Sequence, residues 1–149
     1  MSSHPVSVQD QDLQAIKWNS SSGFASLNRS HLLWHIILSQ HRRRQQQQHQ
    51  EQTDYHRQAA RAVSVAWQEL LGDELGPMPA ELYVNGGGQF IVRRERVLLH
   101  SRQFYQDCLT WLADSLTLSP WDKGMVFEYT WKVIFGETAS VLDHNILSY

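Results

Sequence analysis

The sequence of 149 residues has one cysteine, no long apolar run and almost no excess of charge of either sign. A single cysteine, Cys108, cannot form an internal disulfide, so cysteine usage does not indicate an oxidising compartment. No apolar run approaches the roughly 20 residues that cross a bilayer. The polar N-terminus also lacks the basic start and apolar core of a secretory signal. These absences predict no membrane span and, by default, a cytoplasmic protein.

The charge balance argues against a polyanionic partner. The formal net charge is -2 and the pI is about 6.4, and neither value favours nucleic acid. The basic run Arg42, Arg43 and Arg44 lies within residues 41–52, a glutamine-rich stretch without apolar periodicity. Such a stretch cannot bury one face against a core. We therefore interpret it as a low-complexity insert with solvated charges, and we expect no nucleic-acid partner.

Three short patterns have the spacing of partial metal sites. They are Asp10 with Asp12, His31 with His35, and Asp143 with His144. The two aspartates follow no buried strand and fit a helix N-cap better than a cation site. The first histidine pair would share one face of a helix predicted over residues 30–39, but no third ligand is evident. We therefore predict no metal site.

Length and periodicity predict one domain. Hydrophobic residues make up 42% of the chain, which is enough for a single core at this length. Residues 1–11 are polar and expected to be disordered, and residues 12–149 form the predicted domain. Helical spacing of apolar residues predicts helices, and short β-favouring runs predict strands. The helices are residues 30–39, 54–71, 101–112 and 125–135, and the strands are residues 23–28, 82–84 and 90–92. The expected fold class is α+β, mostly helical with a small sheet.

Local signals set the expected ends of these helices. Asp54 can begin the second helix and Gly72 can end it, while Ser101 is a good N-cap for the third. The last helix is expected to open at Asp122 or at Lys123 and Gly124, and Gly136 is its natural stop. The third helix should bury an apolar face, in which Cys108 is a small buried residue and not a reactive thiol. The face is Phe104, Tyr105, Cys108, Leu109, Trp111 and Leu112.

A glycine loop, residues 86–88, separates the two central strands. Consecutive glycines allow backbone N–H groups to approach an anion or a sugar closely, but they also suit a tight connection with no ligand. The spacing matches neither a dinucleotide-binding fingerprint nor a P-loop. Gln89, Arg93 and Arg94 follow the loop, so any ligand of the loop would meet them.

Glu128 lies within a helix that is apolar on nearly every side, so its carboxylate should be shielded from water. A shielded carboxylate needs a partner or becomes protonated. One interpretation is an ion pair with Lys132, Arg93 or Arg94 that locks the helix to the glycine loop. The other is a functional group, either a general base or a ligand for a substrate hydroxyl.

Several segments together resemble a family of uncharacterised proteins, domain of unknown function 3431. They are residues 23–28 (GFASLN), 67–71 (WQELL), 89–92 (QFIV), 94–96 (RER), 104–105 (FY), 111–112 (WL) and 127–136 (FEYTWKVIFG). The family has cysteines where this chain has residues 86–88, and a histidine where it has Lys132. The resemblance also implies an upstream α/β half, so we expect this chain to correspond to the C-terminal half of a larger α/β domain.

The element order of that family is similar to that of nucleotide-sugar glycosyltransferases, which suggests a glycosyltransferase-like domain or its truncated remnant. The expected ligand is then a nucleotide sugar or carbohydrate, with no cofactor identified. Gly87, Gly88 and Gln89 would line the acceptor side, Arg93 and Arg94 would meet phosphate, and Glu128 would be catalytic. The alternative is a non-catalytic interaction or structural protein, in which exposed aromatics form a partner or self-association surface. Those aromatics are Trp18, Trp34 and Trp121.

Overall fold

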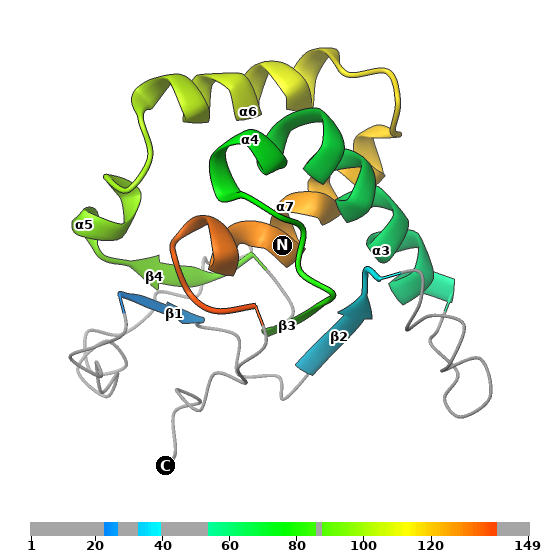
Figure 1. The fold of residues 1–149 in the computed structure, drawn as a ribbon, viewed down its shortest axis with the longest axis horizontal. Helices are drawn as coiled ribbons and strands as arrows, with labels where there is room; N and C mark the ends of the chain where they lie inside the picture. The colour runs from blue at the N-terminus through cyan, green and yellow to red at the C-terminus, as the bar shows by residue number, and fades with distance from the viewer. Residues whose placement is uncertain (1–22, 27–32, 40–53, 86–87, 140–149) are drawn as a thin grey trace, which may run out of the picture.

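The computed structural model describes residues 23–26, 33–39, 54–85 and 88–139. In chain order the elements are β1 (Phe24–Ser26), β2 (Leu33–Ile37), α3 (Asp54–Ala66), the π-helix η1 (Trp67–Leu71), α4 (Gly72–Leu75), β3 (Glu81–Asn85), β4 (Phe90–Val92), α5 (Arg94–Val97), α6 (Arg102–Asp114) and α7 (Pro120–Ile134). The fold is α+β and mostly helical, as predicted (Figure 1). No helix in the described part is both long and apolar enough to cross a bilayer.

Several predictions fall outside the described residues. They concern residues 1–11, for which disorder was predicted, Asp10, Asp12, Trp18, His31, the predicted insert at residues 41–52 with its arginines, Gly87, Asp143 and His144.

The described strands form two antiparallel pairs. β1 pairs with β4, with Phe24 opposite Val92, and β2 pairs with β3, with Trp34 opposite Val84. The strands predicted at residues 82–84 and 90–92 are confirmed, and the expected strand near residue 24 is confirmed as β1. The two central strands do not pair with each other, so the glycine loop connects two different sheets.

The helix predicted over residues 30–39 is wrong, because residues 33–37 form strand β2. An apolar run of this length fits one face of a helix and also fits a strand that is covered on both sides. Ile36 and Ile37 are both buried, at 0% and 1% exposure, so neighbouring positions of this strand are covered. Pairing with β3 decides between the two conformations, and that pairing joins residues more than 40 positions apart.

Helix α7 runs through the middle of the molecule. Figure 1 shows α6 across the top, over α3 and α7, with both pairs of strands below. Most of the second half of α7 is buried, as its apolar sequence predicted, and α3 packs along it. The buried face of α3 is made mainly of small residues, which let the two helices approach closely. These are Ala59, Ala60, Ala62, Val63 and Ala66.

Helix α7 begins earlier than predicted. The Ser119 hydroxyl accepts a hydrogen bond from the Asp122 N–H, and Pro120 occupies the first helical position, where its missing N–H costs nothing. Gly124 is therefore inside the helix and does not open it. The predicted stop at Gly136 is confirmed, with a φ of 81°. Hydrogen bonds from Gly136 N to Val133 O and from Glu137 N to Lys132 O close a Schellman motif.

The predicted end of the second helix at Gly72 is wrong. The helical path continues through η1 and α4 and ends at Gly76, which has a φ of 81°. The Gly72 N–H bonds to the Trp67 carbonyl, which closes the wider π turn. A Cβ at Gly72 would lie 2.7 Å from that carbonyl oxygen, so glycine allows the π turn here and does not stop the helix.

The Ser101 N-cap of α6 is confirmed, since its hydroxyl accepts a hydrogen bond from the Phe104 N–H at 3.1 Å. The buried face of α6 is narrower than predicted: Leu109 and Leu112 are exposed. Cys108 is buried as expected, and burial raises the pKa of its thiol to about 11.

Candidate functional site

An open groove of about 220 Å³ lies between the start of α3 and the first half of α7, and we call it the α3–α7 groove. It is lined by Tyr55, Pro120, Trp121, Gly124, Met125 and Glu128. Pockets for drug-sized ligands measure about 300–1,000 Å³, so this groove suits a smaller molecule, of the size of a single ring.

Three of the lining residues form a row along α7. Trp121, Gly124 and Glu128 are separated by three and four positions, which places them on one face of a helix. The Trp121 side chain is 70% exposed, although a large aromatic residue usually buries most of its surface. An indole and a carboxylate therefore stand two helical turns apart on the same side of α7.

Gly124 separates these two side chains. A Cβ built at Gly124 would meet no atom within 4 Å, so no neighbouring group requires a glycine there. A glycine in a helix interior costs about 0.5–1 kcal/mol relative to alanine. The bare backbone of Gly124 therefore leaves an open floor between Trp121 and Glu128.

The opposite wall of the groove is Tyr55, from the first turn of α3. Burial raises the pKa of the Tyr55 hydroxyl, and the charge of Glu128 raises it further. Trp34 of β2 packs behind this wall. The centre of its ring lies 5.8 Å from that of Tyr55, in an edge-on arrangement, and 5.0 Å from that of Tyr129, on which it stacks. Trp34 is thus half-buried behind the groove, whereas Trp121 is exposed in it.

The Tyr129 hydroxyl lies near the same groups. Burial raises its pKa, followed by the charges of Tyr55 and Glu128. Tyr129 is 0% exposed, and its hydroxyl is one of two buried side-chain atoms in the described part of the chain that have no hydrogen-bond partner. Buried polar groups nearly always have a hydrogen-bond partner, so an unpaired hydroxyl beside the groove is an unusual feature of this region.

Hydrogen bonds fix the width of the groove. The Gln58 amide of α3 donates to Asp122 Oδ1 of α7 at 2.6 Å, and the Ser119 hydroxyl donates to Asp122 Oδ2 at 2.8 Å. The bond from Gln58 joins α3 to the first turn of α7, and the bond from Ser119 orients the Asp122 carboxylate that accepts it.

The ion pair predicted for Glu128 is not formed within the described residues. Glu128 is partly exposed in the groove, and the Lys132 ammonium donates instead to the Tyr83 carbonyl at 3.2 Å. Lys132 therefore joins α7 to β3. Lys132 is only 4% exposed, and this hydrogen bond offsets part of the cost of burying its ammonium group among apolar neighbours.

The predicted substrate-binding residues lie away from this groove. Gly88 and Gln89 are exposed beside β4, and Arg93 and Arg94 are exposed at the start of α5. None of the four lines the α3–α7 groove. Of the predicted site residues in the described part of the chain, the groove contains Glu128 alone, and sequence reasoning did not connect it with Tyr55, Trp121 or Gly124.

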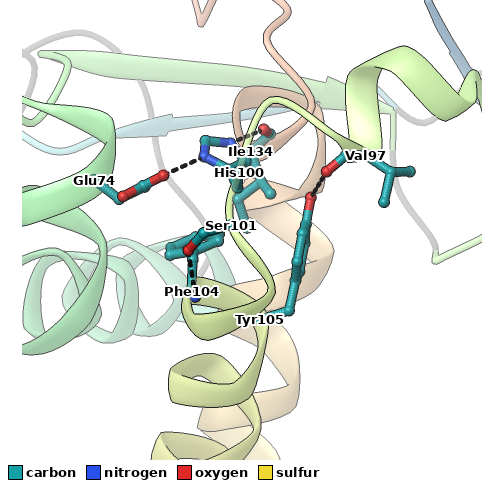
Figure 2. Close-up of polar contacts among 7 residues, drawn as sticks. All are labelled: Glu74, Val97, His100, Ser101, Phe104, Tyr105 and Ile134. Carbon is teal, nitrogen blue, oxygen red and sulfur yellow. Dashed lines mark hydrogen bonds and ion pairs between the residues drawn. The ribbon is translucent and has the colours of Figure 1, made fainter.

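A second polar cluster surrounds His100, which the sequence did not single out. Its Nδ1 lies 2.8 Å from Glu74 Oε1 and its Nε2 lies 2.6 Å from the Ile134 carbonyl oxygen. Figure 2 shows the ring between these two oxygens, with the Tyr105 hydroxyl donating to the Val97 carbonyl nearby. Both ring nitrogens are engaged, so His100 has no free nitrogen for proton transfer. It instead joins α4 to the C-terminus of α7.

Arg96 covers the same end of α7. Its Nη1 donates to the Gly136 carbonyl at 3.2 Å, and its Nη2 lies 3.6 Å from Glu137 Oε1. A Cβ at Gly23 would come within 2.3 Å of the Arg96 side chain, and one at Gly136 within 2.8 Å. The sequence segments around Gly23, Arg96 and Gly136 therefore meet at one point, where two glycines make room for one arginine.

His35 lies on β2, where the helical spacing with His31 does not apply. Its Nε2 is 3.1 Å from Glu81 Oε2, and its ring stacks on that of Tyr83 with the ring centres 4.1 Å apart. Across residues 23–26, 33–39, 54–85 and 88–139, no three or more His, Cys, Asp or Glu side chains gather closely enough to hold a metal ion.

A comparison with protein-family models matches residues 11–146 to the family described as Protein of unknown function (DUF3431). No curated protein and no solved structure matches the chain. The family match covers most of the sequence and includes all the residues that the structure describes. The chain belongs to the DUF3431 family.

Proposed function

We propose that the α3–α7 groove binds a sugar, and that the protein has a glycosyltransferase-like function in which Glu128 acts on a sugar hydroxyl. The observation that carries the proposal is the open floor at Gly124 between the exposed Trp121 ring and the Glu128 carboxylate. The flat C–H face of a pyranose packs well on an indole, and its hydroxyls need nearby hydrogen-bond acceptors. A mostly apolar groove with a few placed polar groups is the usual form of such a site.

In this proposal Glu128 is the general base. The acceptor hydroxyl gives its proton to the carboxylate while its oxygen bonds to the anomeric carbon of a nucleotide sugar, and the bond from that carbon to the nucleotide diphosphate breaks. A base must reach within about 2.6–3.2 Å of the proton donor, and Glu128 opens directly onto the groove. Arg93 and Arg94 remain the candidates for contacts to phosphate, and Gly88 and Gln89 for contacts on the acceptor side, and all four lie outside the groove.

The test is thermal unfolding of the intact chain with a panel of monosaccharides and nucleotide sugars. A sugar present at about 100 times its dissociation constant should stabilise the protein by roughly 2.7 kcal/mol. Trp121→Ala, Glu128→Gln and Gly124→Leu should each reduce that stabilisation, because they remove the stacking surface, remove the charge or fill the floor. Matched controls outside the groove are Leu109→Ala and Glu95→Gln, both exposed positions.

The result separates binding from catalysis. Loss of stabilisation in the three groove variants but not in the controls supports the site. Release of nucleotide from a nucleotide sugar by the native chain, abolished in Glu128→Gln, supports the transferase-like reaction. If no sugar stabilises the native chain, or if the controls lose the effect equally, the proposal is wrong.

A second candidate function, a non-catalytic protein that self-associates, is favoured by an exposed apolar row on and just beyond α6. Leu109, Leu112 and Leu116 are exposed by 62%, 38% and 97% at spacings of three and four residues. Sedimentation at increasing concentration tests it. A monomer at every concentration contradicts this candidate, whereas a dimer that Leu109→Asp dissociates supports it.

A further inference from the structure

We infer, on the basis of the proposed sugar-binding function, that the sugar of the α3–α7 groove is an amino sugar. Its ammonium group would lie against the Glu128 carboxylate and the faces of Tyr55 and Trp121. The inference adds a charge requirement to the proposed function, and it rests on which groups line the groove and which do not.

Among the residues that the structure describes, the groove has a negatively charged lining residue and no cationic one. Glu128 is the charged residue among the lining residues, and none of them is a lysine or arginine. Asp122 follows Trp121 directly. Its two carboxylate oxygens accept hydrogen bonds from neutral groups, the Gln58 amide and the Ser119 hydroxyl. A sugar acid held in the groove would meet like charge here, whereas an ammonium group would meet opposite charge.

The basic residues at the start of α3 do not offset this charge. Arg57 forms an ion pair with Asp54 in the same helical turn. His56 follows Tyr55 directly, and burial, followed by the charge of His35, lowers its pKa. A lowered pKa favours the neutral imidazole, so His56 contributes less positive charge near the groove than an unperturbed histidine would.

The aromatic rings add a second preference for a cation. An ammonium group within about 6 Å of an indole or phenol ring is attracted to the negative face of the ring. Trp121 and Tyr55 stand on opposite walls of the groove, with Glu128 opening onto the same space. The remaining carbons of a sugar ring can still pack on Trp121, so one ligand can use all three groups.

Calorimetric titration of the intact chain with four ligands tests the inference. The ligands are glucosamine, N-acetylglucosamine, glucose and tetramethylammonium, used at about pH 6, where a sugar amine is protonated. Glucosamine should bind roughly tenfold more tightly than glucose, and N-acetylglucosamine, whose nitrogen is uncharged, should behave like glucose. Glu128→Gln should reduce that preference, while Glu95→Gln should leave it unchanged.

The outcomes distinguish this inference from the function on which it rests. Equal binding of glucosamine and glucose overturns the amino-sugar inference and leaves the sugar-binding function intact. Binding of tetramethylammonium as tightly as glucosamine overturns both, because the groove would then be a site for cations alone. Absence of binding by all three sugars also overturns both. Gly124→Leu provides a check that does not change charge: it should weaken every sugar to a similar degree.

Discussion

Replacing Gly124 with alanine should make the protein more stable, even though Gly124 lines the candidate binding site. Gly124 is the fifth residue of the fifteen in α7, so it lies in the helix interior. Alanine is favoured over glycine there by about 0.5–1 kcal/mol, because it restricts the unfolded chain and suits helical geometry. The new methyl group would meet no atom within 4 Å, so no clash offsets the gain.

Urea unfolding followed by circular dichroism measures the effect. With a urea dependence of about 1–3 kcal/mol per molar, a gain of about 1 kcal/mol raises the midpoint by roughly 0.3–1 M, and the slope stays unchanged. Gly124→Leu should be at least as stable as the native protein and should lose sugar binding. Stability and binding would then change in opposite directions at one position.

Two other glycines provide the contrast. Gly72→Ala should destabilise the protein, because its Cβ would lie 2.7 Å from the Trp67 carbonyl oxygen. Gly136→Ala should destabilise it by about 1–2 kcal/mol through its φ of 81° alone, with further loss from the 2.8 Å approach to Arg96. If Gly124→Ala leaves the free energy of unfolding unchanged or lowers it, while these two variants behave as expected, then the space above Gly124 is not open.

Three further predictions concern buried and hydrogen-bonded groups. His100→Phe keeps the ring packing but removes both ring nitrogens, which hydrogen-bond to Ile134 O and Glu74 Oε1. It should lower the free energy of unfolding in urea by about 1–3 kcal/mol, and an unchanged value would contradict the bridging role. Hydrogen bonds, from Thr117 first and then from Trp111, lower the pKa of the Glu69 carboxyl in the folded protein. The Glu69 carboxylate therefore stabilises the fold above its unfolded pKa of about 4.3, and this stabilisation is lost as the pH falls through the folded pKa. In Glu69→Gln, the free energy of unfolding should fall less between about pH 5 and pH 3 than in the native protein. The difference should be less than about 1 kcal/mol, because Glu69 is largely exposed. The same pH dependence in both proteins would argue against these hydrogen bonds. Burial raises the pKa of the Cys108 thiol to about 11 from a usual 9.0. At about pH 8, iodoacetamide should therefore modify the native protein at least about 100-fold more slowly than the chain unfolded in urea. Equal rates would contradict the burial of this thiol.

The candidate site could be predicted only in part from the sequence. Glu128 was singled out because a carboxylate in an apolar helix is unusual, and the structure places it on a groove. Trp121 was considered separately, as an exposed aromatic. Pro120 after Ser119 was the available signal that α7 begins early enough to place both residues on one helical face. Nothing near either residue in sequence indicates Tyr55, which comes from a helix more than 60 positions upstream.

The sequence by itself determined the features that depend on a few neighbouring residues. The Ser101 cap, the stop at Gly136 and the burial of α7 follow from side chains within one or two helical turns, and the α+β class follows from their sum. Tertiary structure decided the features whose energies come from distant partners. Residues 33–37 form a strand because β3, more than 40 positions further along the chain, pairs with them. The α3–α7 groove likewise exists because packing brings α3 beside α7, and no local pattern encodes that approach.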